Sequence, residues 1–490
     1  MSKTIFVFFL VFGFSCQAQY FNELYDFEGA GQAGLSVAET SNGYIQSAMV
    51  LNTAGRERAG YLIVDRNGVV LYKKSYSYGP YLVRNGQMIA LRDGNILDFR
   101  TLQEVNTQGE NVHTWLLLIK VNELGDVIWS KQIKDLSVTW LGAQSLIETS
   151  DSGFVLVADK KINNTNRNPV LIRINKIGNE LFRKEIKTNK SEVLNSASIY
   201  PNGDFVFAGG GDSRGAEFRS WVVRTNDSLD VTWDYYGAYK SSFYSRALVL
   251  SDFTIIHTTD SALPAGDWSI KRLSKLDSNG KEVWGRNHEG SKKNAYYTKA
   301  VELKDRSLVA YGHHDIGGSS FRTLTKLTPE GDTIWSNLYY YISTADRNNL
   351  RDFIATKDGG FLLGGDVSPR STSGGQDLWL LKVDSNGCST PDCKSRVYDV
   401  RLGIDYREQA NTEFKVFPNP VKNVLNIEQI DENSAKTNWT YRLISANGKE
   451  LQMGRFNKEK ILNTSYLPTG VYLLKLENGP IHKVYRVVKE

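Results

Sequence analysis

Short apolar runs separated by polar turns recur along most of the chain, and no long stretch shows the 3.6-residue apolar period of a helix. The clearest example is LDSNGKEVW (276–284), which follows a strand-like run over 270–276. Asp277 is suited to cap a tight turn, and Gly280 is suited to the positive φ that such a turn requires. The pattern predicts a β-hairpin whose second strand runs through Trp284.

Copies of this hairpin recur at intervals of 51 to 57 residues, measured between the residues at its glycine position. Those residues are Gly68, Gly125, Gly178, Leu229, Gly280, Gly331 and Gly387. In the six complete copies an aromatic residue follows four positions later: Tyr72, Trp129, Phe182, Trp233, Trp284 and Trp335. Because such rings bury a large apolar area, we interpret them as packing between neighbouring repeats, with ligand stacking as the alternative.

Each repeat has room for about four short strands. An apolar run precedes the hairpin, as in 152–158 and 307–312, and a more polar segment lies upstream of it. Seven such repeats predict an all-β fold with a seven-bladed β-propeller over residues 19–393, and a linear solenoid is the alternative. The seventh repeat stops at its glycine, whereas residues 20–27 resemble the strand after the other hairpins. We therefore expect residues 20–27 to complete the last blade and close the ring.

Composition and charge narrow the class of protein. A chain of 490 residues exceeds one ordinary core, and its 41% hydrophobic and 11% aromatic content fits a folded protein. The net charge of +5 is too small for this length to indicate nucleic acid or an anionic membrane as a partner.

The first residues have the form of a secretory signal. Lys3 precedes an apolar core over 5–14, and the small residues Cys16 and Ala18 stand before a cut at Gln19. This pattern predicts a signal peptide over residues 1–18, with a lipoprotein cysteine at Cys16 as the alternative. No later segment approaches the about 20 apolar residues of a membrane span, so no transmembrane segment is expected.

The remaining cysteines, Cys388 and Cys393, are separated by four residues and predict a local disulfide in an oxidising compartment. A zinc site is the weaker alternative, because tetrahedral zinc needs four ligands and no histidine lies nearby. No metal and no cofactor are predicted.

A second domain follows residues 394–413, which we interpret as a linker. Over residues 414–490, four strand-like segments alternate with Asn-Gly, Pro and Gly turns, which predicts a small immunoglobulin-like β-sandwich.

This domain resembles the type A sorting domain of the type IX secretion system of Bacteroidota. The resemblance rests on an opening Pro-Asn-Pro, a central Asn-Gly-Lys hairpin, an LPTGVY segment and a basic last strand. Its motif residues are Pro418, Asn419, Pro420, Gly448, Gly470 and Tyr472. The resemblance implies export through the periplasm, recognition by the type IX secretion machinery, and anchoring on surface lipopolysaccharide after removal of the domain. The expected location is the cell surface or the extracellular space.

Polar residues just past the apolar runs form the candidate ligand site. In five repeats this position holds Asp159, Gly210, Thr258, His313 and Asp366, and His314 and Asp315 follow His313. If these strands end on one rim of the propeller, a small-ligand site can form there, with metal or acid–base roles for His313 and Asp366. Solvated loop ends are the alternative interpretation.

A basic residue recurs five positions before the glycine position in six repeats: Lys120, Arg173, Arg224, Lys275, Lys326 and Lys382. Such a period is compatible with a ring of positive charge for an anionic glycan. We favour the alternative in which each residue pairs with a carboxylate or extends to solvent.

The sequence favours a secreted or cell-surface interaction protein that binds glycans or host or other extracellular proteins. A polysaccharide-degrading hydrolase or lyase with its site at the propeller mouth is the alternative. A Gly-rich phosphate loop, a GxSxG elbow, an HExxH helix and a CxxC motif are absent from the sequence.

Overall fold

The computed structural model describes residues 20–27, 31–52, 55–162, 166–187, 191–212, 218–240, 245–262, 269–291, 295–316, 319–339, 341, 347–368, 376–389, 397–399, 414–429, 439–445, 450–478 and 481–490. Every regular element in these ranges is a β-strand, which confirms the all-β prediction. The chain divides into two compact units, unit 1 (Met1–Gly403) and unit 2 (Ile404–Glu490). The predicted signal peptide lies outside the described residues. No helix in the described part is long and apolar enough to cross a membrane.

The described strands of unit 1 pair into seven antiparallel sheets, numbered here in chain order. Sheet 1 comprises β2 (Gln32–Glu39), β3 (Gly43–Leu51), β4 (Glu57–Asp65) and β5 (Val70–Tyr76). Sheet 2 comprises β6 (Leu82–Ala90), β7 (Ile96–Val105), β8 (Asn111–Val121) and β9 (Val127–Ile133). Sheet 3 comprises β10 (Leu141–Glu148), β11 (Phe154–Lys161), β12 (Arg167–Ile174) and β13 (Glu180–Glu185). Sheets 4 and 5 are β14 (Glu192–Ile199), β15 (Phe205–Asp212), β16 (Phe218–Thr225), β17 (Val231–Lys240); and β18 (Arg246–Val249), β19 (Ile255–Ala262), β20 (Ser269–Leu276), β21 (Glu282–Ser291). Sheet 6 is β22 (Ala295–Glu302), β23 (Leu308–Ile316), β24 (Ser319–Leu327), β25 (Thr333–Tyr339), β29 (Val397–Asp399), and sheet 7 is β26 (Arg347–Ala355), β27 (Phe361–Ser368), β28 (Asp377–Val383), β1 (Phe21–Tyr25).

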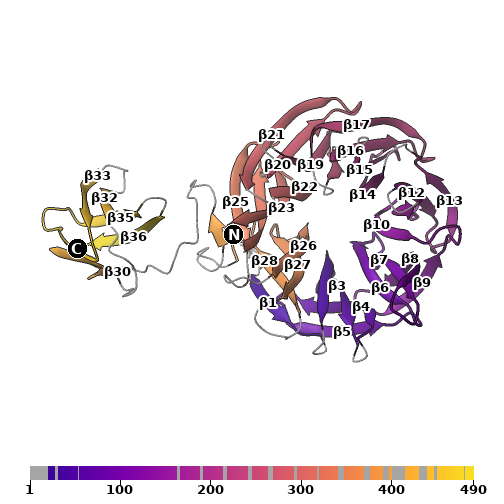
Figure 1. The fold of residues 1–490 in the computed structure, drawn as a ribbon, viewed down its shortest axis with the longest axis horizontal. Helices are drawn as coiled ribbons and strands as arrows, with labels where there is room; N and C mark the ends of the chain where they lie inside the picture. Colours follow the sequence, from indigo (N-terminus) through magenta and orange to yellow (C-terminus); the bar gives the residue numbers. More distant parts are fainter. Residues whose placement is uncertain are drawn as a thin grey trace, which may run out of the picture. The chain divides into compact units, whose positions relative to one another are not determined.

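The seven sheets follow one another around a ring (Figure 1), in the manner of a β-propeller. The first strand of each sheet, such as β10 or β14, lies on the inside of the ring and contacts the first strands of the sheets on either side. The contact of β26 with β2 closes the circle. The described residues of unit 1 thus form as many sheets as the sequence predicts blades.

The N-terminal strand supplies the outer strand of sheet 7. β1 pairs antiparallel with β28, with Phe21 opposite Lys382. In sheet 2 the corresponding pair is Trp129 and Lys120, so Phe21 occupies the aromatic position that the seventh repeat lacks. The expectation that residues 20–27 complete the last sheet is confirmed for β1.

The recurring hairpin forms as the sequence predicts. The Asp277 carboxylate accepts hydrogen bonds from the backbone N–H groups of Asn279 and Lys281, both at 2.9 Å. Gly280 has a φ of 83°, in the left-handed region that glycine adopts without strain. Leu229 takes the same position in sheet 4 with a φ of 63°, and its side chain is buried.

The glycine position also receives the aromatic ring of the preceding sheet. A Cβ atom added at Gly280 would lie 2.8 Å from the Trp233 ring, and one added at Gly331 would lie 2.7 Å from the Trp284 ring. At Gly68 the neighbouring ring is that of Phe21. The four recurring tryptophans therefore pack between neighbouring sheets, as we expected from the sequence, and the missing Cβ makes room for them. Tyr72 is 44% exposed and does not reach Gly125, which contacts Ile63 instead.

The described strands of unit 2 form two sheets. One comprises β30 (Phe414–Phe417), β31 (Val424–Gln429) and β34 (Glu459–Asn463); the other comprises β33 (Glu450–Phe456), β32 (Trp439–Ser445), β35 (Gly470–Asn478) and β36 (Ile481–Lys489). Both contribute to one apolar core that includes Trp439 and Tyr472. The Asn419 side chain ties the Pro-Asn-Pro turn to β36, because it donates to the Arg486 carbonyl at 2.7 Å and accepts from the Val488 N–H at 2.8 Å. The immunoglobulin-like form of this unit stays a prediction.

Two sequence expectations fall at the junction between the units. Val397–Asp399, inside the expected linker, pairs with β25 as a fifth strand of sheet 6, and the rest of 394–413 lies outside the described residues. Cys388 is disulfide-bonded, but Cys393 lies outside the described residues, so the pairing of these two cysteines stays a prediction.

Candidate functional site

The inside of the ring is lined by one residue from the first strand of each sheet. In sheet 3 this residue pairs with Val157, which is the fourth residue of β11. The residues of the other six sheets pair with the equivalent position of their own second strand. In five of the sheets a β-bulge immediately precedes the residue and turns its side chain. We call this set the axial ring: Ser36, Gln87, Ser145, Ser196, Arg246, Lys299 and Asp352.

The charges of the axial ring lie in sheets 5 to 7. The Lys299 ammonium forms an ion pair with Asp352 at 2.7 Å and donates to the Phe353 carbonyl at 2.9 Å. The second carboxylate oxygen of Asp352 accepts from the Val37 N–H of sheet 1 at 3.3 Å. The only carboxylate of the axial ring is therefore held from both neighbouring sheets.

Arg246 is the second cation of the axial ring. Its side chain is half-buried, and no hydrogen bond or ion pair joins its guanidinium group to another residue in the described part of the chain. Burial lowers the pKa of Arg246, and the Asp352 carboxylate opposes this shift. The axial ring thus carries two cations and one anion.

Two cavities follow the axis. One of about 110 Å³ is lined by Arg246, Lys299, Gln87, Ser145 and Ser196, together with neighbouring apolar side chains. A larger one of about 620 Å³, which we call the mouth cavity, is also lined by Gln87 and Lys299 and extends to the turns between the first and second strands of sheets 1, 2 and 7. Gln87 and Lys299 are therefore shared by the linings of both cavities.

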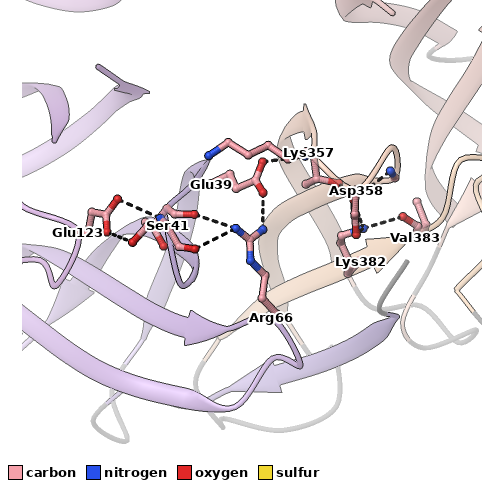
Figure 2. A network of polar contacts seen from close by, with 11 residues as sticks. Glu39, Ser41, Arg66, Glu123, Lys357, Asp358, Lys382 and Val383 are labelled. Carbon is pink, nitrogen blue, oxygen red and sulfur yellow. Dashed lines mark hydrogen bonds and ion pairs between the residues drawn. The ribbon is translucent and has the colours of Figure 1, made fainter. Parts of the chain in front are cut away.

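A polar network holds the rim of the mouth cavity (Figure 2). Glu39 forms an ion pair with Arg66 of its own sheet and accepts from the Lys357 N–H of sheet 7 at 2.9 Å. Ser41 donates from its backbone N–H to Glu123 of sheet 2 at 2.9 Å and also from its hydroxyl. These bonds fix three sheets relative to one another at the entrance to the axis.

The recurring basic residues contribute to the framework. Each of the six forms an ion pair with an aspartate in the first turn of its own sheet: Lys120–Asp93, Arg173–Asp151, Arg224–Asp204, Lys275–Asp252, Lys326–Asp305 and Lys382–Asp358. Hydrogen bonds from Thr149 and Arg173 hold the pKa of Asp151 well below its ordinary value. Sheet 1 has Ile63 in place of the base. These pairs favour the structural interpretation over a ring of charge for an anionic glycan.

The sequence-predicted site residues lie near the far ends of the second strands, and the two aspartates are buried and paired. Asp159 accepts from Gln144 at 2.7 Å and from Arg167 at 2.9 Å. Asp366 accepts from Asn349 at 3.1 Å and from Arg351 at 2.8 Å. Neither aspartate is a solvated loop end, and each has its charge compensated within its own sheet.

The two histidines occupy different surroundings. His313 stacks on Tyr296 with 5.0 Å between ring centroids, and its Nε2 lies 2.7 Å from the Asp315 carboxylate. His314 is buried, and burial lowers its pKa to about 3. His314 is therefore a neutral core residue.

The structure links His313 and Asp366 only indirectly. Arg322, opposite His313 in the sheet, donates to Asn349 at 3.2 Å, and Asn349 donates to Asp366. Asp159 belongs to sheet 3, and the partners of its hydrogen bonds, Trp140, Gln144 and Arg167, come from the same part of the chain. Within the described residues, no group of three or more His, Cys, Asp or Glu side chains is arranged to hold a metal ion.

The register of sheet 5 corrects one alignment. Phe253 lies in the turn before β19 with a φ of 64°, so the strand begins at Ile255 and Asp260, not Thr258, is the equivalent of Asp159. The sequence alignment of sheet 5 is displaced because Phe253, although exposed, resembles the first residue of an apolar strand. The axial ring gives no repeated signal in the sequence, because its members differ in residue type and lie in the polar segments upstream of the apolar runs.

The C-terminal unit matches a known family. Residues 415–490 match the family model described as "Secretion system C-terminal sorting domain". Residues 415–490 are a type IX secretion system sorting domain. This domain implies that the chain is exported to the cell surface or the extracellular space and that it meets the type IX secretion machinery.

Among curated proteins, none matches the chain. Several solved structures share its β fold at low identity. A polysaccharide lyase of family PL25, an ulvan lyase bound to -[GlcA(1-4)Rha3S]-, has a TM-score of 0.49 at 9% identity and covers 76% of this chain and 99% of its own. Domains 1–2 of Drosophila Semaphorin 1b give 0.39 at 10%, covering 77% and 86%. The GH93 α-L-arabinofuranosidase of Fusarium graminearum gives 0.43 at 12%, covering 63% and 95%. These likenesses are too remote to indicate a shared activity.

Proposed function

We propose that the chain is an exported binding protein whose propeller takes up an extracellular glycan at the mouth cavity. The supporting observation is the cavity itself, about 620 Å³ in volume and lined by both polar and apolar side chains. Sites for small ligands have this size and this mixed lining. The network around Glu39 and Ser41 holds the rim in one arrangement, which lowers the ordering cost of binding.

The pairing of the predicted acids favours binding over catalysis. A polysaccharide-degrading hydrolase or lyase needs a group that exchanges a proton with the substrate, and in hydrolases two carboxyl groups flank the scissile bond. Asp159 and Asp366 instead accept hydrogen bonds from arginine and amide groups of their own sheets, so both carboxylates are already occupied by structural partners. In the proposal they hold their sheets together.

The proposed route begins with a signal peptide over residues 1–18 and passage through the periplasm of a Bacteroidota cell. The sorting domain then directs transfer to the surface, where its removal leaves the propeller anchored on lipopolysaccharide. A chain that lacks residues 414–490 should accumulate in the periplasm, as measured by cell fractionation. Normal surface delivery of the truncated chain would contradict the route.

Two assays on the purified chain test the binding proposal. A glycan array should give binding to at least one polysaccharide, and Ser41→Trp, which places a large ring at the rim, should weaken it about tenfold or more. Lys281→Trp, in an exposed turn of sheet 5, is the matched control and should leave binding unchanged. Depolymerisation of the bound glycan would establish the enzyme instead, and equal binding by both variants would remove the mouth cavity from the proposal.

A further inference from the structure

The axial ring places a cation that has no hydrogen-bond acceptor among the described residues beside a cavity. Arg246 lines the cavity of about 110 Å³, and the described residues offer its guanidinium group no hydrogen-bond acceptor. Asp352, the one carboxylate of the ring, already accepts from Lys299 and from the Val37 N–H. The attraction of the Asp352 charge offsets only part of the cost of burying Arg246, because burial still lowers the pKa of Arg246.

The groups around Arg246 are suited to an anionic ligand. Lys299 lines the same cavity and uses two of its three possible hydrogen bonds, to Asp352 and to the Phe353 carbonyl. Ser145 and Gln87 add neutral polar groups, a hydroxyl and an amide N–H, that are able to donate to an anion. No carboxylate lines this cavity, so none of its described lining residues carries a negative charge.

The shape of the guanidinium group narrows the class of anion. Its planar fork matches the two oxygens of a carboxylate, which can accept two parallel hydrogen bonds. A cavity of about 110 Å³ accommodates a carboxylate with a few attached atoms, since a water molecule occupies about 30 Å³ in the liquid. Gln87 and Lys299 also line the mouth cavity, so a longer ligand that passes these two side chains reaches it.

We propose that Arg246 and Lys299 bind a carboxylate group on the axis of the propeller. The group belongs either to a small free acid or to an acidic sugar of the glycan that enters through the mouth cavity. The second source rests on the proposed function, whereas the carboxylate site itself does not depend on it.

Calorimetric titration of the purified chain with sodium D-glucuronate tests the site, with D-glucose as the neutral probe. Glucuronate should bind and glucose should not. Arg246→Gln should weaken glucuronate binding about tenfold or more, the usual effect of losing a charge-assisted bond. Arg246→Lys keeps the charge and loses the planar fork, so its affinity for glucuronate should lie between those of the wild type and Arg246→Gln. Arg286→Gln, on the outer strand of the same sheet, is the matched control and should bind like the wild type.

Thermal unfolding separates a binding role from a structural one. Without ligand, Arg246→Gln should unfold at the wild-type temperature or above it, because it removes a half-buried charge whose burial cost Asp352 offsets only in part. Added glucuronate should raise the unfolding temperature of the wild type and not of Arg246→Gln. A lower unfolding temperature of ligand-free Arg246→Gln, or equal glucuronate binding by Arg246→Gln and the control Arg286→Gln, would overturn the proposal.

Polymer titrations distinguish the two sources. A polyuronate that binds with the same dependence on Arg246 identifies an acidic glycan, and binding of the free acid alone identifies a small acid. If neutral glycans bind equally to the wild type and to Arg246→Gln, and glucuronate does not bind, the carboxylate site is overturned and the proposed function stands. If glucuronate binds and no glycan does, the carboxylate site stands and the proposed function is overturned.

Discussion

Closure of the ring by β1 has a measurable energetic consequence. Phe21 is 7% exposed, packs against the Tyr44 ring at 6.0 Å between centroids, and fills the space beside Gly68. Truncating such a ring to alanine costs about 3 to 5 kcal/mol. Phe182 occupies the same position in sheet 3 but is 37% exposed, so Phe182→Ala should cost only about 1 to 2 kcal/mol.

Urea unfolding followed by tryptophan fluorescence measures this difference. Nine of the ten tryptophans belong to unit 1, so the signal reports chiefly on the ring. Phe21→Ala should lower the free energy of unfolding by at least about 1 kcal/mol more than Phe182→Ala does. Equal losses in the two variants, or an unchanged midpoint for Phe21→Ala, would refute the reasoning that β1 closes the ring through its aromatic side chain.

Three further predictions follow from single positions. Gly280→Ala should destabilise by at least about 1 kcal/mol more than Gly359→Ala in the same urea assay, because both need a positive φ but only Gly280 has a ring within 2.8 Å of the added Cβ. Burial and then Arg272 lower the pKa of His257 to about 3, below its unfolded value of about 6.5. Its contribution to stability is therefore complete above pH 6.5 and is lost as the pH falls, by about 3 kcal/mol at pH 4.5, and His257→Gln should show a shallower loss of stability in acid. Asn419→Ala should destabilise unit 2 by about 1 to 3 kcal/mol and speed hydrogen exchange at the Val488 amide; unchanged exchange would contradict the clamp.

The framework of the propeller could be predicted because its determinants are local in sequence. Asp277 and Gly280 act within one turn, and the spacing from Gly280 to Trp284 is set by a single hairpin. Even the closure by Phe21 follows from a local signal, since the last repeat ends without its aromatic residue. Repetition makes each such signal visible several times in one chain.

The axial ring could not be found in the same way. Its residues come from seven sheets and meet only after the ring closes, and a β-bulge in the first strand removes the simple alternation that would reveal their direction. The misplaced start of β19 has a related cause. Phe253 is apolar and adjoins an apolar strand, and only its positive φ shows that it belongs to the turn.

Some positions hold the same kind of residue in nearly every sheet and others differ from sheet to sheet, and the positions that differ indicate where a ligand binds. The glycine positions, their aromatic partners and the six base–aspartate pairs serve the same packing role in nearly every sheet, so they distinguish no part of the ring from another. The axial ring has the opposite character, because sheets 1 to 4 contribute neutral Ser36, Gln87, Ser145 and Ser196. Sheets 5 to 7 contribute Arg246, Lys299 and Asp352 at equivalent positions. Packing alone does not require this asymmetry, since small polar side chains satisfy the same strand positions in the other four sheets. A charged half of the axis facing a neutral half orients a ligand that carries its own charge at one end.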